Sequence, residues 1–131
     1  MTEESAPGAH WLRVCDSDAL DEGGDGRRVD LPPLREGGAP RAAFVVRYAG
    51  RPRGWLNRCA HVPVELDWIP GKFFDDSGLY LICATHGATY EPDTGRCVAG
   101  PCRGAGLEPV PVCEHEGGIW VDPLNRSQTN S

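Results

Sequence analysis

Two short pairs of cysteine and histidine are the residues of this chain best suited to hold a metal. Cys59-Ala60-His61 forms the first pair and Cys83-Ala84-Thr85-His86 the second, with residues 62–82 between them. Zinc accepts thiolate and imidazole ligands in sets of four. Two Cys and two His also hold a [2Fe–2S] centre, in which the thiolates bind one iron and the imidazoles bind the other. The short spacings suit loops at strand ends better than a helix face.

The flanking residues resemble the paired boxes of the Rieske iron–sulfur family. Cys59-Ala60-His61 and Cys83-Ala84-Thr85-His86-Gly87 are similar to its C-x-H and C-x-x-H-G boxes, and Gly100-Pro101 is similar to its cluster-covering proline loop. The resemblance covers about residues 10–122. It implies one Rieske-type [2Fe–2S] cluster, whose cofactor-binding and metal ligands are Cys59, His61, Cys83 and His86.

The same resemblance implies supporting roles around the cluster for Gly87, Ala88, Tyr90 and Pro101. Tyr90 matches a tyrosine whose hydroxyl bonds a cysteine sulfur, whereas Ala88 stands where quinol-oxidising relatives carry a serine hydroxyl. Val64 and Thr85 stand where those relatives carry an additional disulfide. Hydrogen bonds to cluster sulfurs raise the reduction potential, so one missing hydroxyl predicts a value in the lower part of the range of about −150 to +300 mV.

Four cysteines lie outside the two pairs. Cys15 and Cys113 fall in predicted strands, where a buried thiol behaves as a small hydrophobic group. Cys97 and Cys102 flank Gly100-Pro101, which leaves a bridging or redox-sensing role open beside an ordinary structural one. His10 and His115 are expected to be surface histidines.

Length and composition favour a single β-rich domain over residues 1–131, with a core over about residues 10–122 and loose tails at 1–9 and 124–131. The 131 residues include 17 Gly and 12 Pro, which favours turns and short strands. The net charge of −6 argues against a nucleic-acid partner. No apolar run is long enough to span a membrane. The acidic N-terminus does not resemble a secretory signal, so a cytoplasmic location is expected.

Apolar and β-branched runs predict the strands. Expected strands cover residues 10–15, 27–31, 42–48, 54–58, 79–82, 88–91, 96–98, 109–113 and 118–121, with turns at 49–52 and 114–117. Residues 62–82 are expected to be mostly loop, packed down by Trp68, Phe73 and Phe74. The predicted fold is therefore all-β, a Rieske fold of small antiparallel sheets with an inserted two-loop cluster-binding subdomain at about residues 57–101.

The resemblance implies a soluble, monomeric one-electron carrier, a stand-alone Rieske ferredoxin. Its expected partners are a flavin or NAD(P)H-dependent reductase and a terminal oxygenase or another redox protein. The chain alone is not expected to be an enzyme, because it shows no nucleophile dyad or phosphate loop. It is also too short to include the mononuclear-iron domain of a full oxygenase. Two alternatives remain: a Rieske-like small subunit of an oxygenase or nitrite reductase complex, and a zinc-binding structural module.

Overall fold

The fold is built from short antiparallel strands. The computed structural model describes residues 7–34, 36–59, 64–67, 69–85, 87–101 and 104–123. These residues form nine strands and one 3₁₀ turn: β1 (Leu12–Asp16), η1 (Ser17–Ala19), β2 (Arg27–Leu31), β3 (Arg41–Tyr48), β4 (Arg51–Leu56), β5 (Leu81–Ile82), β6 (Thr89–Tyr90), β7 (Cys97–Ala99), β8 (Val112–His115) and β9 (Gly118–Val121). The predicted all-β class is confirmed.

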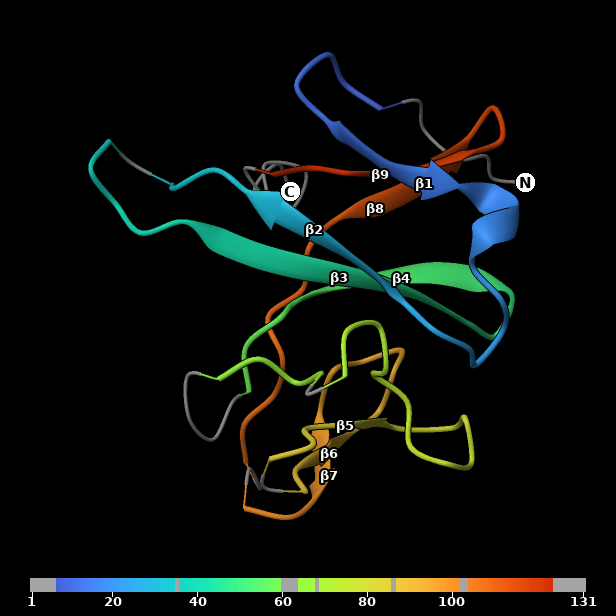
Figure 1. Cartoon of the computed structure of the whole chain (residues 1–131), viewed down its shortest axis with the longest axis vertical. Coiled ribbons are helices and arrows are strands. Elements are labelled where there is room, and N and C mark those ends of the chain that lie inside the picture. The colour runs from blue at the N-terminus through green and yellow to red at the C-terminus, as the bar shows by residue number, and fades with distance from the viewer. Residues whose placement is uncertain are drawn as a thin grey trace.

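The strands make three sheets of three strands each, in the orders β1-β9-β8, β2-β3-β4 and β5-β6-β7. Figure 1 shows the first two sheets lying across one another in the upper part of the molecule, with the third sheet and its long loops below them. The third sheet lies within residues 57–101, between β4 and β8 in the chain, which is where the inserted subdomain is predicted. Across the described residues, no helix is long and apolar enough to span a membrane.

The centre of β3 is buried on both faces. Ala43, Phe44, Val45 and Val46 are all 0% exposed. Successive side chains of a strand point to opposite faces of the sheet. Phe44 and Val46 accordingly pack in one buried cluster, while Ala43 and Val45 pack in another with Ile119 of β9. This double burial explains why the strand reads as a continuous apolar run rather than an alternating one.

The loop before β5 packs directly onto β3. The ring of Phe73 is 0% exposed and stacks on Phe44, with 3.9 Å between ring centroids and 8° between ring planes. Phe74 is half-buried against the same cluster. These two aromatic side chains hold the loop down as predicted, whereas Trp68 lies outside the described residues.

Two hairpin turns are shorter than the sequence predicts. Ala49 and Gly50 form the first turn with φ angles of 55° and 78°, and β4 starts at Arg51 instead of residue 54. Pro52 is tolerated within β4 because β4 is an edge strand, where the missing N–H interrupts no ladder. Glu116 and Gly117 form the second turn with φ angles of 51° and 78°.

The strand expected at residues 109–113 begins only at Val112. Pro109 and Pro111 lack the N–H that a ladder needs. Pro109 takes part only in an isolated bridge to Trp55. The same segment still joins the two sheets, because Val110 N–H donates to Gly54 O at 3.0 Å.

Arg47 of β3 connects the two upper sheets. Its guanidinium donates to the carbonyls of Ser17 and Leu20, each at 2.9 Å, and binds both carboxylate oxygens of Glu114 on β8, at 2.9 and 3.3 Å. These hydrogen bonds from Arg47 lower the pKa of Glu114 below its ordinary value of 4.5. The ion pair is half-buried, so solvent screens it less than it screens a surface pair.

We expect Glu114→Gln to lower stability at neutral pH by about 1 kcal/mol, because it removes a charge-assisted pair of hydrogen bonds. The folded-state pKa of Glu114 is depressed, so the extra stability is present above the unfolded-state value and is lost as pH falls through the folded-state value. Thermal unfolding of the wild type and the variant, followed by circular dichroism at decreasing pH, measures this loss of stability. The matched control is Glu116→Gln, since Glu116 is 83% exposed in the adjoining turn. Equal effects of the two changes on stability would contradict a stabilising role for the Arg47–Glu114 pair.

Candidate metal centre

The structure brings Cys59 and Cys83 into one buried cluster. Cys59 follows the end of β4 and is 2% exposed, while Cys83 follows β5 directly and is 0% exposed. Both belong to the cluster that Phe44 and Tyr90 also line. Both are thiols rather than disulfide sulfurs. Two thiols from distant parts of the chain thus lie in one water-excluded region, which suits the ligands of a metal centre.

Each cysteine begins a short loop that a backbone hydrogen bond closes. Cys59 N–H donates to Val64 O, and Cys83 N–H donates to Ala88 O, both at 2.8 Å. Gly87 N–H also donates to Cys83 O at 2.8 Å. These bonds fix the backbone at both ends of the two segments to which the predicted ligands His61 and His86 belong. The two histidines lie outside the described residues, as do positions 60, 62 and 63.

Tyr90 lies directly beside one cysteine. Its side chain is 0% exposed, and its hydroxyl oxygen is 3.3 Å from Cys59 Sγ. A thiolate has no proton to give, so the phenol O–H donates once Cys59 is deprotonated as a ligand. This is the contact that the resemblance implies for this hydroxyl. Sequence reasoning does not identify which of the two cysteines it meets, because that depends on how β6 packs against β4.

The Gly100-Pro101 turn lies against the second cysteine loop. Gly100 has φ 91°, and a Cβ placed on it would lie 2.9 Å from both Ala88 Cα and Gly87 O. Ala88 is 0% exposed, so its backbone is packed in on all sides and cannot shift to make room for a side chain at position 100. Gly87 and Pro101 are themselves exposed. The turn can therefore cover the cysteine loop closely while leaving part of its own surface open.

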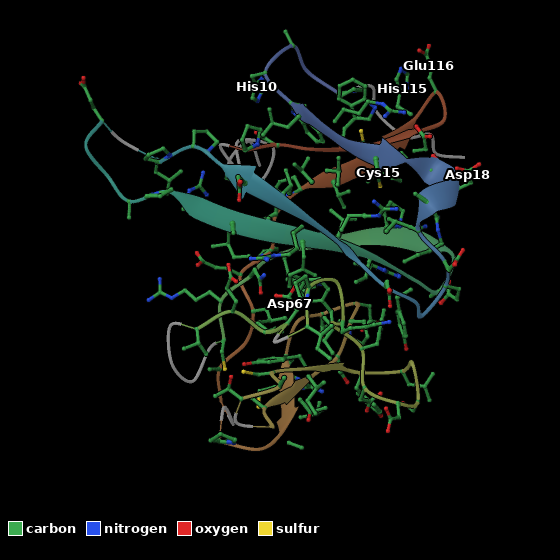
Figure 2. All side chains as sticks on the ribbon, in the orientation of Figure 1. His10, Cys15, Asp18, Asp67, His115 and Glu116 are labelled. Carbon is green, nitrogen blue, oxygen red and sulfur yellow. The ribbon has the colours of Figure 1, made fainter. Side chains whose placement is uncertain are left out.

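The cysteines outside the two pairs differ in state. Cys97 of β7 is disulfide-bonded, which favours the bridging alternative for the cysteines near the Gly100-Pro101 turn; Cys102 lies outside the described residues. Cys15 and Cys113 are half-buried thiols of β1 and β8. Burial raises the pKa of the Cys15 thiol, so it stays neutral and apolar in its strand. Figure 2 places Cys15, His10 and His115 at the opposite end of the molecule from β5, β6 and β7.

A buried polar network, which the sequence analysis does not identify, joins the two cysteine segments. Asn57 donates to Asp67 through Nδ2 at 3.0 Å and accepts from Leu66 N–H through Oδ1 at 2.8 Å. Leu66 O in turn accepts from Ala84 N–H at 3.0 Å. Asn57 and Asp67 stand beside leucines in the sequence, but a polar residue next to an apolar one is too common to predict a buried network.

The donor set fits the cysteine-bearing half of a [2Fe–2S] centre. Cys59 and Cys83 would hold one iron, since both thiols are buried together and Tyr90 offers a hydrogen bond to sulfur. Within the described residues, no group of three or more His, Cys, Asp or Glu side chains is placed to bind a metal. The thiols alone do not distinguish iron–sulfur from zinc, because both accept cysteine.

Comparison with known families does distinguish them. A sequence model described as "Rieske [2Fe-2S] domain" matches residues 10–116. This span includes both cysteine–histidine pairs and the Gly100-Pro101 turn. No curated protein sequence matches the chain significantly.

Solved structures share the fold. A chain in the complex of reduced oxygenase and oxidized ferredoxin in carbazole 1,9a-dioxygenase is 27% identical with a TM-score of 0.67, over 88% of this chain and 95% of that chain. The ferredoxin of carbazole 1,9a-dioxygenase from Nocardioides aromaticivorans IC177 is 22% identical with a TM-score of 0.64, over 88% and 99%. The Sphingomonas yanoikuyae B1 ferredoxin is 24% identical with a TM-score of 0.59, over 85% and 96%.

The same fold also occurs inside a longer chain. The terminal oxygenase of carbazole 1,9a-dioxygenase from Nocardioides aromaticivorans IC177 is 25% identical with a TM-score of 0.64. The match covers 86% of this chain but only 29% of the oxygenase chain.

We expect Gly100→Ala to destabilise the protein more than Gly104→Ala, by roughly 2 kcal/mol. Both glycines have positive φ angles, 91° and 86°, so both changes carry the same conformational cost. Only at position 100 does the new methyl group meet backbone atoms, whereas nothing lies within 4 Å at position 104. Thermal unfolding midpoints compare the two variants, and equal midpoints would show that the turn does not press on the cysteine loop.

Proposed function

This chain belongs to the Rieske [2Fe-2S] domain family, and from that premise we propose that it is a soluble one-electron carrier. The cofactor of the family is a [2Fe–2S] cluster held by two Cys and two His. We assign Cys59 and Cys83 to one iron and His61 and His86 to the other. The observation that carries the proposal is the burial of the two thiols in one core cluster at the start of the loops that bear these histidines.

The exposure of the neighbouring residues supports a role in electron exchange. Cys59 and Cys83 are buried, yet Ala84, Gly87 and Pro101 lie at the surface. A partner protein could therefore approach the second cysteine loop closely, Gly87 by lacking a side chain and Pro101 by being rigid. When bound, the cluster would supply one-electron redox chemistry. The chain itself would exclude water from the sulfurs and donate a hydrogen bond from Tyr90 to Cys59.

The proposed partners are a flavin or NAD(P)H-dependent reductase as electron donor and a terminal oxygenase or another redox protein as acceptor. The similarity to a chain of nearly the same extent in an oxygenase–ferredoxin complex supports the second partner. We further propose a monomer that acts in the cytoplasm. Gel filtration of the isolated protein tests the monomeric state, and reversible reduction by a generic flavin reductase tests the carrier role.

A second candidate, a small subunit of an oxygenase or nitrite reductase complex, is favoured by exposed apolar side chains in the unit that contains β5, β6 and β7 and their loops. Ile69, Leu79 and Tyr80 are 64%, 55% and 41% exposed. Such residues are also common on monomers. Co-purification separates the two candidates: a carrier is stable and soluble alone, whereas a subunit is recovered with a larger protein.

We expect electron paramagnetic resonance of the dithionite-reduced protein to show a rhombic signal with the low average g of a His-ligated [2Fe–2S] centre. His86→Ala should abolish or convert this signal because a ligand to iron is lost. The matched control His115→Ala should leave it intact, since His115 lies on β8 at the far end of the molecule. A normal Rieske signal from the His86 variant would contradict the ligand assignment, and a colourless wild-type protein without inorganic sulfide would support zinc.

We expect Tyr90→Phe to lower the reduction potential while keeping the cluster. The change removes the hydroxyl 3.3 Å from Cys59 Sγ and leaves the buried ring in place. A hydrogen bond contributes about 1 kcal/mol, and 59 mV corresponds to tenfold in a one-electron equilibrium, so a decrease on the order of 50 mV is expected. Voltammetry measures it. The control is Tyr80→Phe, whose hydroxyl lies on an exposed side chain.

A further inference from the structure

Asp67 carries a fully buried carboxylate between the two cysteines in the sequence. Its side chain is 0% exposed. Figure 2 shows Asp67 at the junction between the β2-β3-β4 sheet and the unit that contains β5, β6 and β7. A buried charge is costly to stability unless it is paired and hydrogen-bonded. Its presence at this position therefore needs an explanation from its surroundings.

Among the described residues, the partners of Asp67 are N–H donors. Oδ1 accepts from Asn57 Nδ2 at 3.0 Å, and Oδ2 accepts from Gly71 N–H at 2.9 Å. The Nε of Arg28 on β2 lies 3.5 Å from Oδ2. An ionised carboxylate accepts hydrogen bonds at both oxygens and donates none, which is what this set of partners requires. Arg28 supplies the compensating positive charge.

The compensation by Arg28 is incomplete. Its side chain is 37% exposed, and its NH2 group donates to Glu65 Oε1 at 2.6 Å. One guanidinium therefore faces two carboxylates, of which Asp67 is buried and Glu65 is 48% exposed. Within this group of three there are two negative charges and one positive charge, and water screens the field of the buried carboxylate least.

The carboxylate is linked to both cysteine segments. Asn57, its hydrogen-bond partner, stands two residues before Cys59. Leu66, its chain neighbour, accepts through its carbonyl from Ala84 N–H, next to Cys83, and packs in the same buried cluster as both thiols. A continuous path of hydrogen bonds and packed side chains thus connects Asp67 to the predicted metal centre from both sides.

We propose that the Asp67–Arg28 pair is a determinant of the reduction potential of this centre, with the Asp67 carboxylate lowering it and Arg28 offsetting that effect. The inference rests on the proposed function. Reduction adds one negative charge to the centre, and a nearby buried carboxylate disfavours that charge. The effect of Asp67 adds to the lowering of the potential that the missing hydroxyl at Ala88 predicts.

The test measures the potential of the holoprotein by voltammetry in paired variants. Asp67→Asn keeps the shape of the side chain but removes its charge, and should favour reduction about tenfold, a rise of about 59 mV. Arg28→Gln leaves the hydrogen bonds of Asp67 in place and should disfavour reduction several-fold. Shifts of the potential in opposite directions would show an effect of charge. A merely structural role would give no shift, or shifts in the same direction.

Matched controls come from the exposed pair of Asp25 and Lys72. Their side chains are 63% and 56% exposed and lie 2.8 Å apart. Asp25→Asn and Lys72→Gln make the same chemical changes at a solvent-exposed pair, and should leave the potential unchanged. Equal shifts in the controls would overturn the proposal, because net charge alone would then explain the result.

The failure of this inference is distinguishable from the failure of the proposed function. A wild-type protein without a Rieske resonance signal overturns the proposed function itself. A normal signal in wild type and variants, with potentials that do not move, overturns only the role of Asp67 and Arg28. Should Asp67→Asn fail to hold the cluster, Arg28→Gln still decides, since an unchanged potential in that variant overturns the proposal.

Discussion

The double burial of β3 is the constraint on which the rest of the structure depends. One face of this strand forms the core of the upper sheets with Ile119 and Val121 of β9, and the other carries Phe44, on which Phe73 stacks. A strand buried on both faces must be apolar at every position, and the run Ala43–Val46 meets that demand. In the unit that contains β5, β6 and β7, the described strands are only two or three residues long, and most of the chain is loop. The loops gain a fixed position because one of their aromatic rings packs on this strand.

The cysteine loops are held by backbone bonds and by packing together. Each is closed across its own ends, at Cys59–Val64 and at Cys83–Ala88, and the bond from Ala84 to Leu66 ties one loop to the chain that follows the other. Such bonds do not depend on side-chain identity, so they define loop shape while the side chains remain available for chemistry. Burial of the thiols excludes water from the sulfurs, and exposure of Gly87 and Pro101 leaves an approach from outside. This combination suits a centre that exchanges electrons with another protein.

Two arginines of the middle sheet connect the three layers by charge. Arg47 of β3 binds Glu114 in the sheet above and the carbonyl of Ser17 in η1, and Arg28 of β2 binds Glu65 and lies near Asp67 in the unit below. The two pairs have different consequences. The pair with Glu114 acts on stability, because it joins two sheets. The pair with Asp67 lies beside the cysteine segments, and we propose that its charges therefore influence the reduction potential of the centre. Hydrophobic packing thus brings the layers together, while these ion pairs add specific contacts between them.

The sequence by itself determined the fold class of the protein and the types of residue at its candidate metal centre. Cys59 and Cys83 with their nearby histidines predicted an iron–sulfur cluster, and the apolar run of β3 predicted its central strand, because these signals are local in the chain. The strand ends near Pro52 and Pro109 were placed wrongly, since whether a proline interrupts a strand depends on whether its position must donate an N–H to a partner strand, and the pairing of strands decides that. Tertiary structure alone decided that Tyr90 meets Cys59 and that Asp67 is buried against Asn57 and Arg28. These contacts join residues far apart in the chain, and their energies depend on burial, which no local pattern specifies.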